Sequence, residues 1–150
     1  MKKILILLCA TSLLQPLFAQ QATVTETVET VKTYPFSDPD PVADPSDLFY
    51  PYFRFDGFSA KGTNQQWKVV SLENDYIKLT LFPEIGGKIW GAVDKTTGKE
   101  FIYNNHVVKF RDIAMRGPWT SGGIEFNFGI IGHAPTSSTP VDYVTRQKPD

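Results

Sequence analysis

The sequence predicts an all-β fold, and more narrowly an antiparallel β-sandwich. Apolar and polar residues alternate in short runs, and the runs are separated by short segments rich in turn-forming residues. No stretch of about ten residues or more has the 3.6-residue apolar period of a capped helix. Strands joined by short connections pair as antiparallel neighbours, and their apolar face needs a second layer to cover it.

The N-terminal part is predicted to be a strand followed by an extended arm. Residues 22–33, ATVTETVETVKT, are rich in Val and Thr and favour an exposed edge strand. Residues 34–51 contain five prolines, so we expect a solvated linker with capping aspartates rather than a helix, a strand or a calcium loop. The dense aromatic residues at 48–58, LFYPYFRFDGF, are expected to dock this arm onto a sheet or to lie at the rim of a site.

A β-hairpin is predicted next, from residues 66–72 and 76–82. The two runs, QWKVVSL and YIKLTLF, are joined by the turn END. Alternation in the second run places three apolar residues inward, namely Ile77, Leu79 and Leu81, and it places Lys78 and Thr80 outward.

The segment PEIGG then interrupts the strands. Pro83 ends a ladder because it has no N–H, and the two glycines that follow permit either a corner or a close backbone approach. Strands are predicted at 88–94 and 99–103, with Gly98 suited to a positive φ in the turn between them. Lys88 either extends into solvent or reaches a ligand, and residues 141–147, VDYVTRQ, are again strand-like.

The first 19 residues have the layout of a secretory signal peptide. Two lysines precede an apolar run over residues 4–14, and a small residue, Ala19, marks the expected cleavage site. The run is too short to span a membrane. We therefore expect an exported protein, periplasmic or extracellular, with no membrane span in the mature chain. The single cysteine, Cys9, leaves with this peptide.

Charge and metal-binding residues exclude several function classes. Removing residues 1–19 takes two lysines and no acids, so 13 basic residues face 16 acidic ones, without a basic cluster. Nucleic acid is therefore an unexpected partner. The two histidines, His106 and His133, form no zinc pattern, and we predict neither a metal nor a cofactor, although calcium stays open.

The domain organisation predicted is a signal peptide at 1–19, an N-terminal strand and arm at 20–65, and the first portion of a sandwich at 66–150. Because a strand-like run has just ended at the C-terminus, we expect an N-terminal fragment of a longer protein, with possible protein partners bound by sequence beyond residue 150. A partial sandwich exposes unpaired edges, so this portion is expected to express poorly alone.

The candidate site lies in residues 122–133, GGIEFNFGIIGH. Read as a strand, this segment points Ile124, Phe126 and Phe128 to a core, and Glu125 and Asn127 to the other face. Neighbouring glycines, at 122, 123 and 129, are expected to leave room for a ligand.

Carboxylate, amide and imidazole groups in one short segment favour a sugar-binding site. Acid and amide groups hydrogen-bond vicinal hydroxyls, and an aromatic ring packs against the C–H face of a sugar. The predicted catalytic residues are Glu125 and His133, and the predicted substrate-binding residues are Asn127, Trp119, Arg116 and Trp90. In the structural alternative, Glu125 forms a salt bridge to Arg116 or Arg111, and Asn127 holds a loop.

A family resemblance adds to this interpretation. Residues 72–103, with LFPEIGGKIWGAVDKTTG, resemble the opening of galactose-mutarotase-like sandwich proteins, and residues 107–143 look like the exported bacterial family known as domain of unknown function 5107. The resemblance implies a large carbohydrate-active sandwich, of which this chain supplies the first portion, often followed by tetratricopeptide repeats. In mutarotases the catalytic acid and base lie later in the chain, so the resemblance transfers no catalytic residue.

Three functions stay open at this point. The first is an enzyme acting at an anomeric centre, as an epimerase-like protein or a glycoside hydrolase, whose second carboxylate would be Asp112, Asp142 or a residue further on. The second is a non-catalytic carbohydrate-binding module. The third is a purely structural part of a sandwich.

Overall fold

The computed structural model describes residues 22–36, 59–112, 118–127, 133 and 135–147. It contains seven strands and one 3₁₀ turn among these residues: β1 (Thr23–Tyr34), β2 (Thr63–Glu73), β3 (Ile77–Phe82), β4 (Lys88–Asp94), β5 (Lys99–Ile102), β6 (Val107–Asp112), β7 (Pro118–Thr120) and η2 (Pro135–Ser138). The all-β prediction is confirmed. The signal peptide, the aromatic segment at 48–58 and Arg116 lie outside the described residues.

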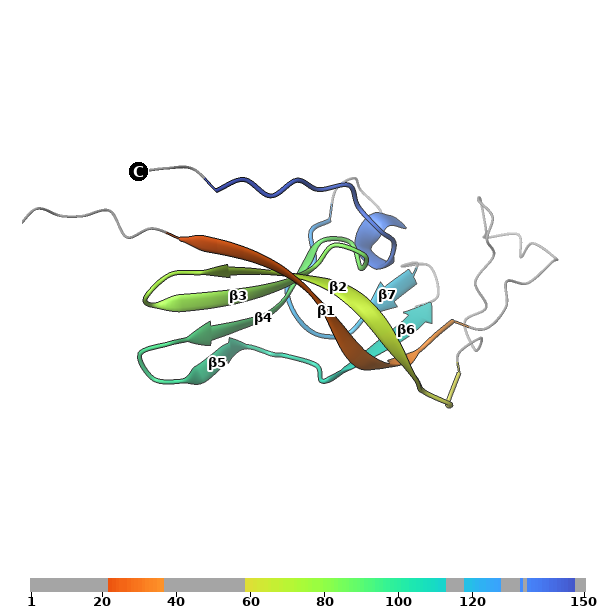
Figure 1. The fold of residues 1–150 in the computed structure, drawn as a ribbon. Helices are drawn as coiled ribbons and strands as arrows, with labels where there is room; N and C mark the ends of the chain where they lie inside the picture. Colours follow the sequence, from red (N-terminus) through yellow and green to blue (C-terminus); the bar gives the residue numbers. More distant parts are fainter. Residues whose placement is uncertain (1–21, 37–58, 113–117, 128–132, 134, 148–150) are drawn as a thin grey trace, which may run out of the picture.

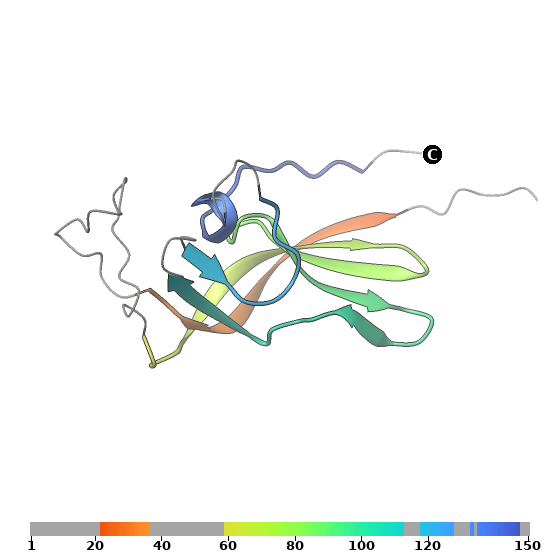
Figure 2. The ribbon, with the colours of Figure 1, turned by 180° about the vertical axis from the view of Figure 1, so that it is seen from behind.

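All seven strands form one curled sheet, in the order β5-β4-β3-β2-β1-β6-β7 (Figures 1 and 2). The neighbours are antiparallel except β1 and β6, which run parallel and pair through Lys32–Tyr34. The sheet is therefore mixed, which corrects the prediction of antiparallel strands throughout. A parallel pair needs a long connection, and here β2 to β5 supply it.

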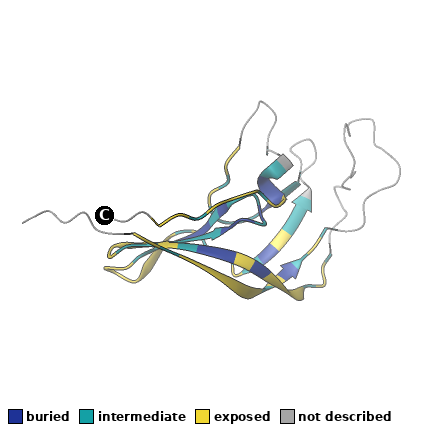
Figure 3. Ribbon diagram, turned by 45° about the horizontal axis from the view of Figure 1, so that its top comes forward, coloured by how far each residue is buried: buried dark blue, intermediate teal, exposed yellow. Residues whose placement is uncertain are grey.

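The predicted edge strand, β1, is exposed along most of its length and is an edge of the sheet over its first part, whereas its last part lies between two strands. It pairs with β2 from Thr23 to Thr33 and with β6 from Lys32 to Tyr34, so its first part has one ladder and its last part has two. Figure 3 shows the exposed positions along β1 and at the hairpin ends.

The turns form as their residues predict. Asn74 closes the β2–β3 hairpin by accepting hydrogen bonds at Oδ1 from the N–H groups of Tyr76 (2.9 Å) and Ile77 (2.8 Å). In the β4–β5 turn, Gly98 has a φ of 69° and donates its N–H to the Asp94 carbonyl at 2.7 Å, as predicted for this glycine.

Residues 83–87 make both the corner and the close approach that the sequence left open. Gly86 has a φ of 66°, and a Cβ there would lie 2.6 Å from the carbonyl oxygen of Thr136 in η2. Gly86 is therefore required because η2, a later part of the chain, packs directly against its backbone. The N–H of Gly86 donates to the Thr139 carbonyl at 2.7 Å, which fixes η2 against this corner.

The core lies on one face of the sheet. Its buried members come from β2, β3, β4, β6 and the β3–β4 corner: Trp67, Val69, Phe82, Ile85, Trp90 and Val108. Ile77 is exposed and Leu79 and Leu81 are half-buried, so the predicted inward set of β3 is wrong. Leu81 pairs with Val70, on the opposite side of β2 from Val69. Because β2 has buried residues on both of its faces, alternation alone could not identify the core face.

Residues 139–147 run alongside the start of β1 but form no strand, which corrects the strand-like prediction for 141–147 (Figure 1). Backbone hydrogen bonds attach the beginning of this segment to the β3–β4 corner, from Gly86 to the Thr139 carbonyl and from Val141 to the Pro83 carbonyl. Side chains attach the rest: Tyr143 and Thr145 donate to the Glu26 carboxylate at 3.0 and 2.6 Å, and the Gln147 amide donates to the Ala22 carbonyl. No helix within the described ranges is long and apolar enough to cross a membrane.

Candidate functional site

A buried lysine lies at the base of the candidate site. Lys88 opens β4 and is 1% exposed, and its Nζ donates to the carbonyl (2.6 Å) and Oγ1 (3.0 Å) of Thr120 in β7. The same Nζ lies 3.7 Å from Oε2 of Glu125 and 5.8 Å from the centre of the Trp90 ring. Burial lowers the pKa of Lys88, and the Glu125 charge opposes that shift.

Glu125 connects this lysine to His133. Its side chain is 10% exposed, and Oε1 forms a short hydrogen bond with Nδ1 of His133. Oε2 is buried and has no hydrogen-bond partner among the described residues, although the Lys88 charge is close. A carboxylate oxygen in this state can accept a hydrogen bond from a ligand hydroxyl.

His133 is the more accessible member of the pair, with 21% of its side chain exposed. Its ring centre lies 5.9 Å from that of Trp119, which is half-buried on β7. Because Nδ1 is hydrogen-bonded to a carboxylate, Nε2 is the nitrogen that can exchange a proton with a ligand. Glu125, His133 and Trp119 are therefore brought together, and Lys88 joins them.

The glycines before Glu125 serve a different purpose from the one predicted. A Cβ on Gly123, which has a φ of 67°, would lie 2.3 Å from the carbonyl oxygen of Ile89 in β4. The N–H of Ile124 donates to that same carbonyl at 2.8 Å. Gly123 therefore lets the chain lie directly against β4, beside Lys88, and leaves no room there for a ligand. Gly129 lies outside the described residues.

No strand forms over 122–127 or at 133, the described part of the predicted strand 122–133, and the two predicted faces are reversed. Among the described residues 122–127, only an isolated bridge between Ile89 and Ile124 has strand character. Ile124 and Phe126 are 41% and 54% exposed, while Glu125 points inward. Asn127 is exposed, so it shares no strand face with Glu125, and Phe128 lies outside the described residues. The reason is electrostatic, because buried Lys88 supplies the partner that allows a carboxylate to point inward.

Trp90 belongs to the core and not to a sugar-stacking surface. It is 3% exposed, its ring centre lies 4.9 Å from that of Phe82, and its Nε1 donates to the Asn105 carbonyl at 2.8 Å. The prediction that it packs against a sugar is therefore wrong.

Lys88 is the site residue that the sequence interpretation undervalued. The sequence left Lys88 either in solvent or at a ligand, whereas its side chain is buried and hydrogen-bonded to Thr120. The sequence feature that could have indicated its burial is its position, directly after two glycines and before the apolar run Ile-Trp-Gly-Ala-Val. The predicted alternative of a Glu125 salt bridge is correct in kind, and the partner that the structure shows is Lys88.

The arrangement suits proton transfer and hydrogen bonding. In the part of the chain that the structure describes, no three His, Cys, Asp or Glu side chains gather as a metal site would require. What the site offers is a carboxylate–imidazole pair, a cation beneath it and an aromatic ring beside it.

Comparison with known proteins gives two matches. The family model described as Domain of unknown function (DUF5107) matches residues 44–150. A solved structure, that of a TPR-domain containing protein from Parabacteroides distasonis ATCC 8503, is 28% identical to this chain with a TM-score of 0.72. The match covers 87% of this chain and 23% of that protein, so the chain spans about a quarter of the length of the protein it matches.

Proposed function

Since this chain belongs to the DUF5107 family, whose description names no activity, we propose from the site itself that the protein binds a carbohydrate and acts at its anomeric centre. The observation that carries the proposal is the Glu125–His133 hydrogen bond beside the half-buried ring of Trp119. The family membership agrees with the resemblance noted in residues 107–143. The relation to galactose mutarotases, and with it a second sheet completing a sandwich, is part of the proposal.

The choice of a sugar as ligand follows from the groups available. Trp119 supplies an apolar ring of the kind that packs against the C–H face of a pyranose. Beside it, the buried Oε2 of Glu125 can accept from one hydroxyl, and the His133 imidazole can bond to another. An aromatic plane beside converging hydrogen-bonding groups is the general pattern of a small-molecule site, and the neighbouring hydroxyls of a sugar match the acceptors and donors present here.

The choice of an anomeric reaction follows from the carboxylate–imidazole pair. Ring opening of an aldose requires a base for the C1 hydroxyl proton and an acid for the ring oxygen, and a positioned group of this kind contributes about 10²- to 10⁴-fold. In this reaction Glu125 takes the proton of the C1 hydroxyl as the bond between C1 and the ring oxygen breaks, and His133 gives a proton to the ring oxygen from Nε2. The hydrogen bond between Glu125 and His133 holds the imidazole in one orientation. The Lys88 Nζ, which lies 3.7 Å from Oε2, fixes the position of the Glu125 side chain.

Glycoside hydrolysis is the alternative reaction at the same centre. Hydrolysis needs a second carboxylate about 5 to 9.5 Å from the first. Of the candidates from the sequence, Asp142 is exposed on the segment beyond η2, the side chain of Asp112 lies outside the described part, and the third is a residue further along the chain. The proposal places the protein outside the cytoplasm, as the leader at 1–19 predicts. Protein partners would be bound by tetratricopeptide repeats, as the name of the Parabacteroides protein suggests.

A non-catalytic carbohydrate-binding module is the second candidate, and one observation favours it. Glu125 is already engaged by His133 and Lys88, as a residue that only holds the loop in place would be. In this case Trp119 binds the sugar and no proton moves.

The test measures mutarotation and binding in the protein expressed at full length. Polarimetry follows α-D-glucose and α-D-galactose, and release of 4-nitrophenol follows a set of aryl glycosides. We expect Glu125→Gln and His133→Ala each to lower the rate by about 10²-fold or more. The matched controls, Glu29→Gln and His106→Ala, change exposed residues of the same types and should leave it unchanged. Unchanged activity in both site variants would remove the site assignment.

Calorimetry separates the second candidate from the first. Sugar binding that is lost in Trp119→Ala but kept in the control Tyr103→Ala, with no turnover over long incubation, would establish a binding module. Tyr103 is a suitable control because it is an exposed aromatic residue outside the Trp119–His133 contact.

A further inference from the structure

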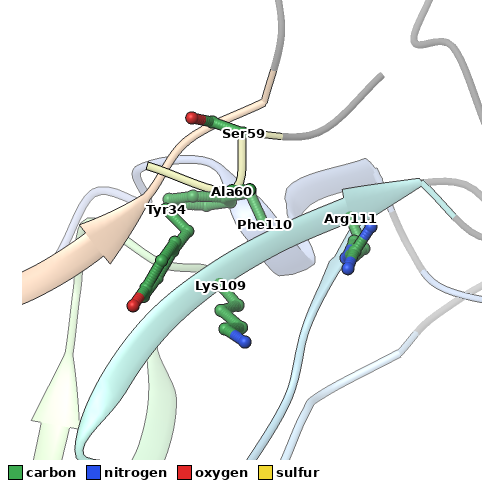
Figure 4. A pocket seen from close by; sticks show the side chains of 6 residues that line it. All are labelled: Tyr34, Ser59, Ala60, Lys109, Phe110 and Arg111. Atoms are coloured by element: carbon green, nitrogen blue, oxygen red, sulfur yellow. The ribbon is translucent and has the colours of Figure 1, made fainter. Parts of the chain in front are cut away.

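A cavity of about 260 Å³ lies at the junction of β1 and β6 (Figure 4). It is lined by Tyr34, Ser59, Ala60, Lys109, Phe110 and Arg111. Figure 4 shows Lys109 and Arg111 leaving one side of β6, as residues two apart on a strand must, with the Tyr34 ring close to Lys109. This cavity is separate from the contacts that define the Glu125–His133 pair.

Positive charge is concentrated here in a chain whose formal net charge is −1. The Lys109 Nζ lies 4.9 Å from the centre of the Tyr34 ring, and the Lys32 Nζ lies 5.6 Å from the same centre. Neither ammonium forms an ion pair with a carboxylate of the described residues. Two ammonium groups at one ring repel each other, and a bound anion would relieve that repulsion.

Arg111 extends this charge toward the candidate site. It pairs directly with Trp119 across the β6–β7 ladder, so the two side chains leave the same side of the sheet with Cβ atoms about 5 Å apart. Trp119 in turn contacts His133. The row Lys109, Arg111, Trp119 and His133 therefore runs continuously from the cavity to the carboxylate–imidazole pair.

We propose that the cavity is a subsite for the anionic group of an acidic saccharide, either a uronic acid carboxylate or a sulfate ester, whose adjoining sugar ring lies on Trp119. This inference rests on the proposed function and narrows its substrate class. A guanidinium binds carboxylate and sulfate oxygens through paired hydrogen bonds, and a nearby ammonium adds charge. A guanidinium also has five donors, so Arg111 can keep a partner within the protein and still bind such a group.

The experiment compares anionic saccharides with their neutral counterparts. Calorimetry at low ionic strength, where exposed charges are least screened, uses the protein expressed at full length. The probes are oligogalacturonates and alginate oligosaccharides with their methyl esters, and sulfated carrageenan oligosaccharides with their desulfated forms. We expect at least one anionic member to bind about tenfold tighter than its neutral counterpart. Whether that member is a uronate or a sulfate identifies the source of the charge.

The variants assign that preference to the cavity. Lys109→Gln and Arg111→Gln should each remove most of the anionic preference, while neutral saccharides bind as before. The matched control is Lys78→Gln, because Lys78 is an exposed lysine on β3, away from the cavity. Trp119→Ala should weaken the anionic and neutral members alike.

The outcomes separate this inference from the proposed function. If neutral saccharides bind as tightly as anionic ones, or the two cavity variants behave like Lys78→Gln, the subsite is wrong and the proposed function stands. If no saccharide of either kind binds, the proposed function fails and the subsite fails with it. A single-stranded oligonucleotide of matched charge that binds as tightly as the best saccharide would also overturn the assignment, because it would show unselective attraction of polyanions.

Discussion

Replacing Glu125 with glutamine leaves the Lys88 ammonium buried without a carboxylate beside it. At 3.7 Å, the two charges attract each other by about 4 kcal/mol at an effective dielectric constant of about 20. Desolvation of the two groups offsets part of this attraction, and Lys88 keeps both of its Thr120 acceptors in the variant. We therefore expect Glu125→Gln to lower the free energy of unfolding by about 2 kcal/mol.

A double-mutant cycle with Lys88→Met tests whether the loss comes from the ion pair. Methionine keeps the linear stem and removes the buried charge, so adding Lys88→Met to Glu125→Gln should recover part of the stability. We expect the double variant to be more stable than the sum of the single effects predicts, by about 1 to 2 kcal/mol. Urea unfolding followed by circular dichroism measures the free energy of unfolding of the wild type, the two single variants and the double variant. Glu29→Gln is the control for replacement of an exposed glutamate. Additivity within about 0.5 kcal/mol would refute the coupling.

The pH dependence provides an independent check on the same lysine. The pKa of folded Lys88 is lowered by burial, so on raising the pH the folded protein loses this proton before the unfolded chain does. The cost of the buried charge is present below the folded pKa and disappears as the pH rises toward the unfolded value. The stability of the wild type relative to Lys88→Met should therefore increase with pH in that window, and a decrease would contradict it.

Two further predictions concern parts of the fold that hold the site in place. Gly123→Ala should lower the free energy of unfolding by about 2 kcal/mol or more, because the added Cβ would collide with the Ile89 carbonyl. The control is Gly98→Ala, which has a similar φ but open space around it and should lower the free energy of unfolding by about 1 kcal/mol. Equal losses in the two variants would exclude the collision. Hydrogen bonds, chiefly from Thr145, lower the pKa of Glu26, so docking of residues 139–147 should be present above the unfolded pKa and lost as the pH falls through the folded one. The protection factor of the Val24 amide, which donates to the Gln147 side chain, should fall in acid after correction for the intrinsic pH dependence of amide exchange. A protection factor that is independent of pH, or unchanged in Glu26→Gln, would count against the contact.

Local features of the fold were predictable because local chemistry determines them. The β2–β3 hairpin and the positive φ of Gly98 follow from turn residues within a few positions of each other. The parallel pairing of β1 with β6 has no such signal, because its partners are far apart in sequence. The same limitation explains why the second ladder at the end of β1 was not predicted.

The candidate site was predictable in its members more than in its geometry. Polar residues in an apolar segment indicated Glu125 and His133, and these two side chains contact each other in the structure. Their functional role stays a prediction. The direction of Glu125 depends on Lys88, a residue 37 positions earlier whose burial only the three-dimensional structure reveals. Apolar alternation therefore gave the wrong face for Ile124 and Phe126.

The three-residue ladder between β1 and β6 has a consequence for how the protein folds. Its first partners, Lys32 and Val107, are 75 residues apart, whereas β2 to β5 pair with their neighbours through short turns. Closing that long loop costs entropy that few hydrogen bonds offset, so we expect β2 to β5 to form early and β6 and β7 to join late. Lys88 bonds Thr120 across this late junction, and Trp119 arrives with it. The proposed site would then be assembled in the final step of folding and be among the first parts lost when the native state opens locally.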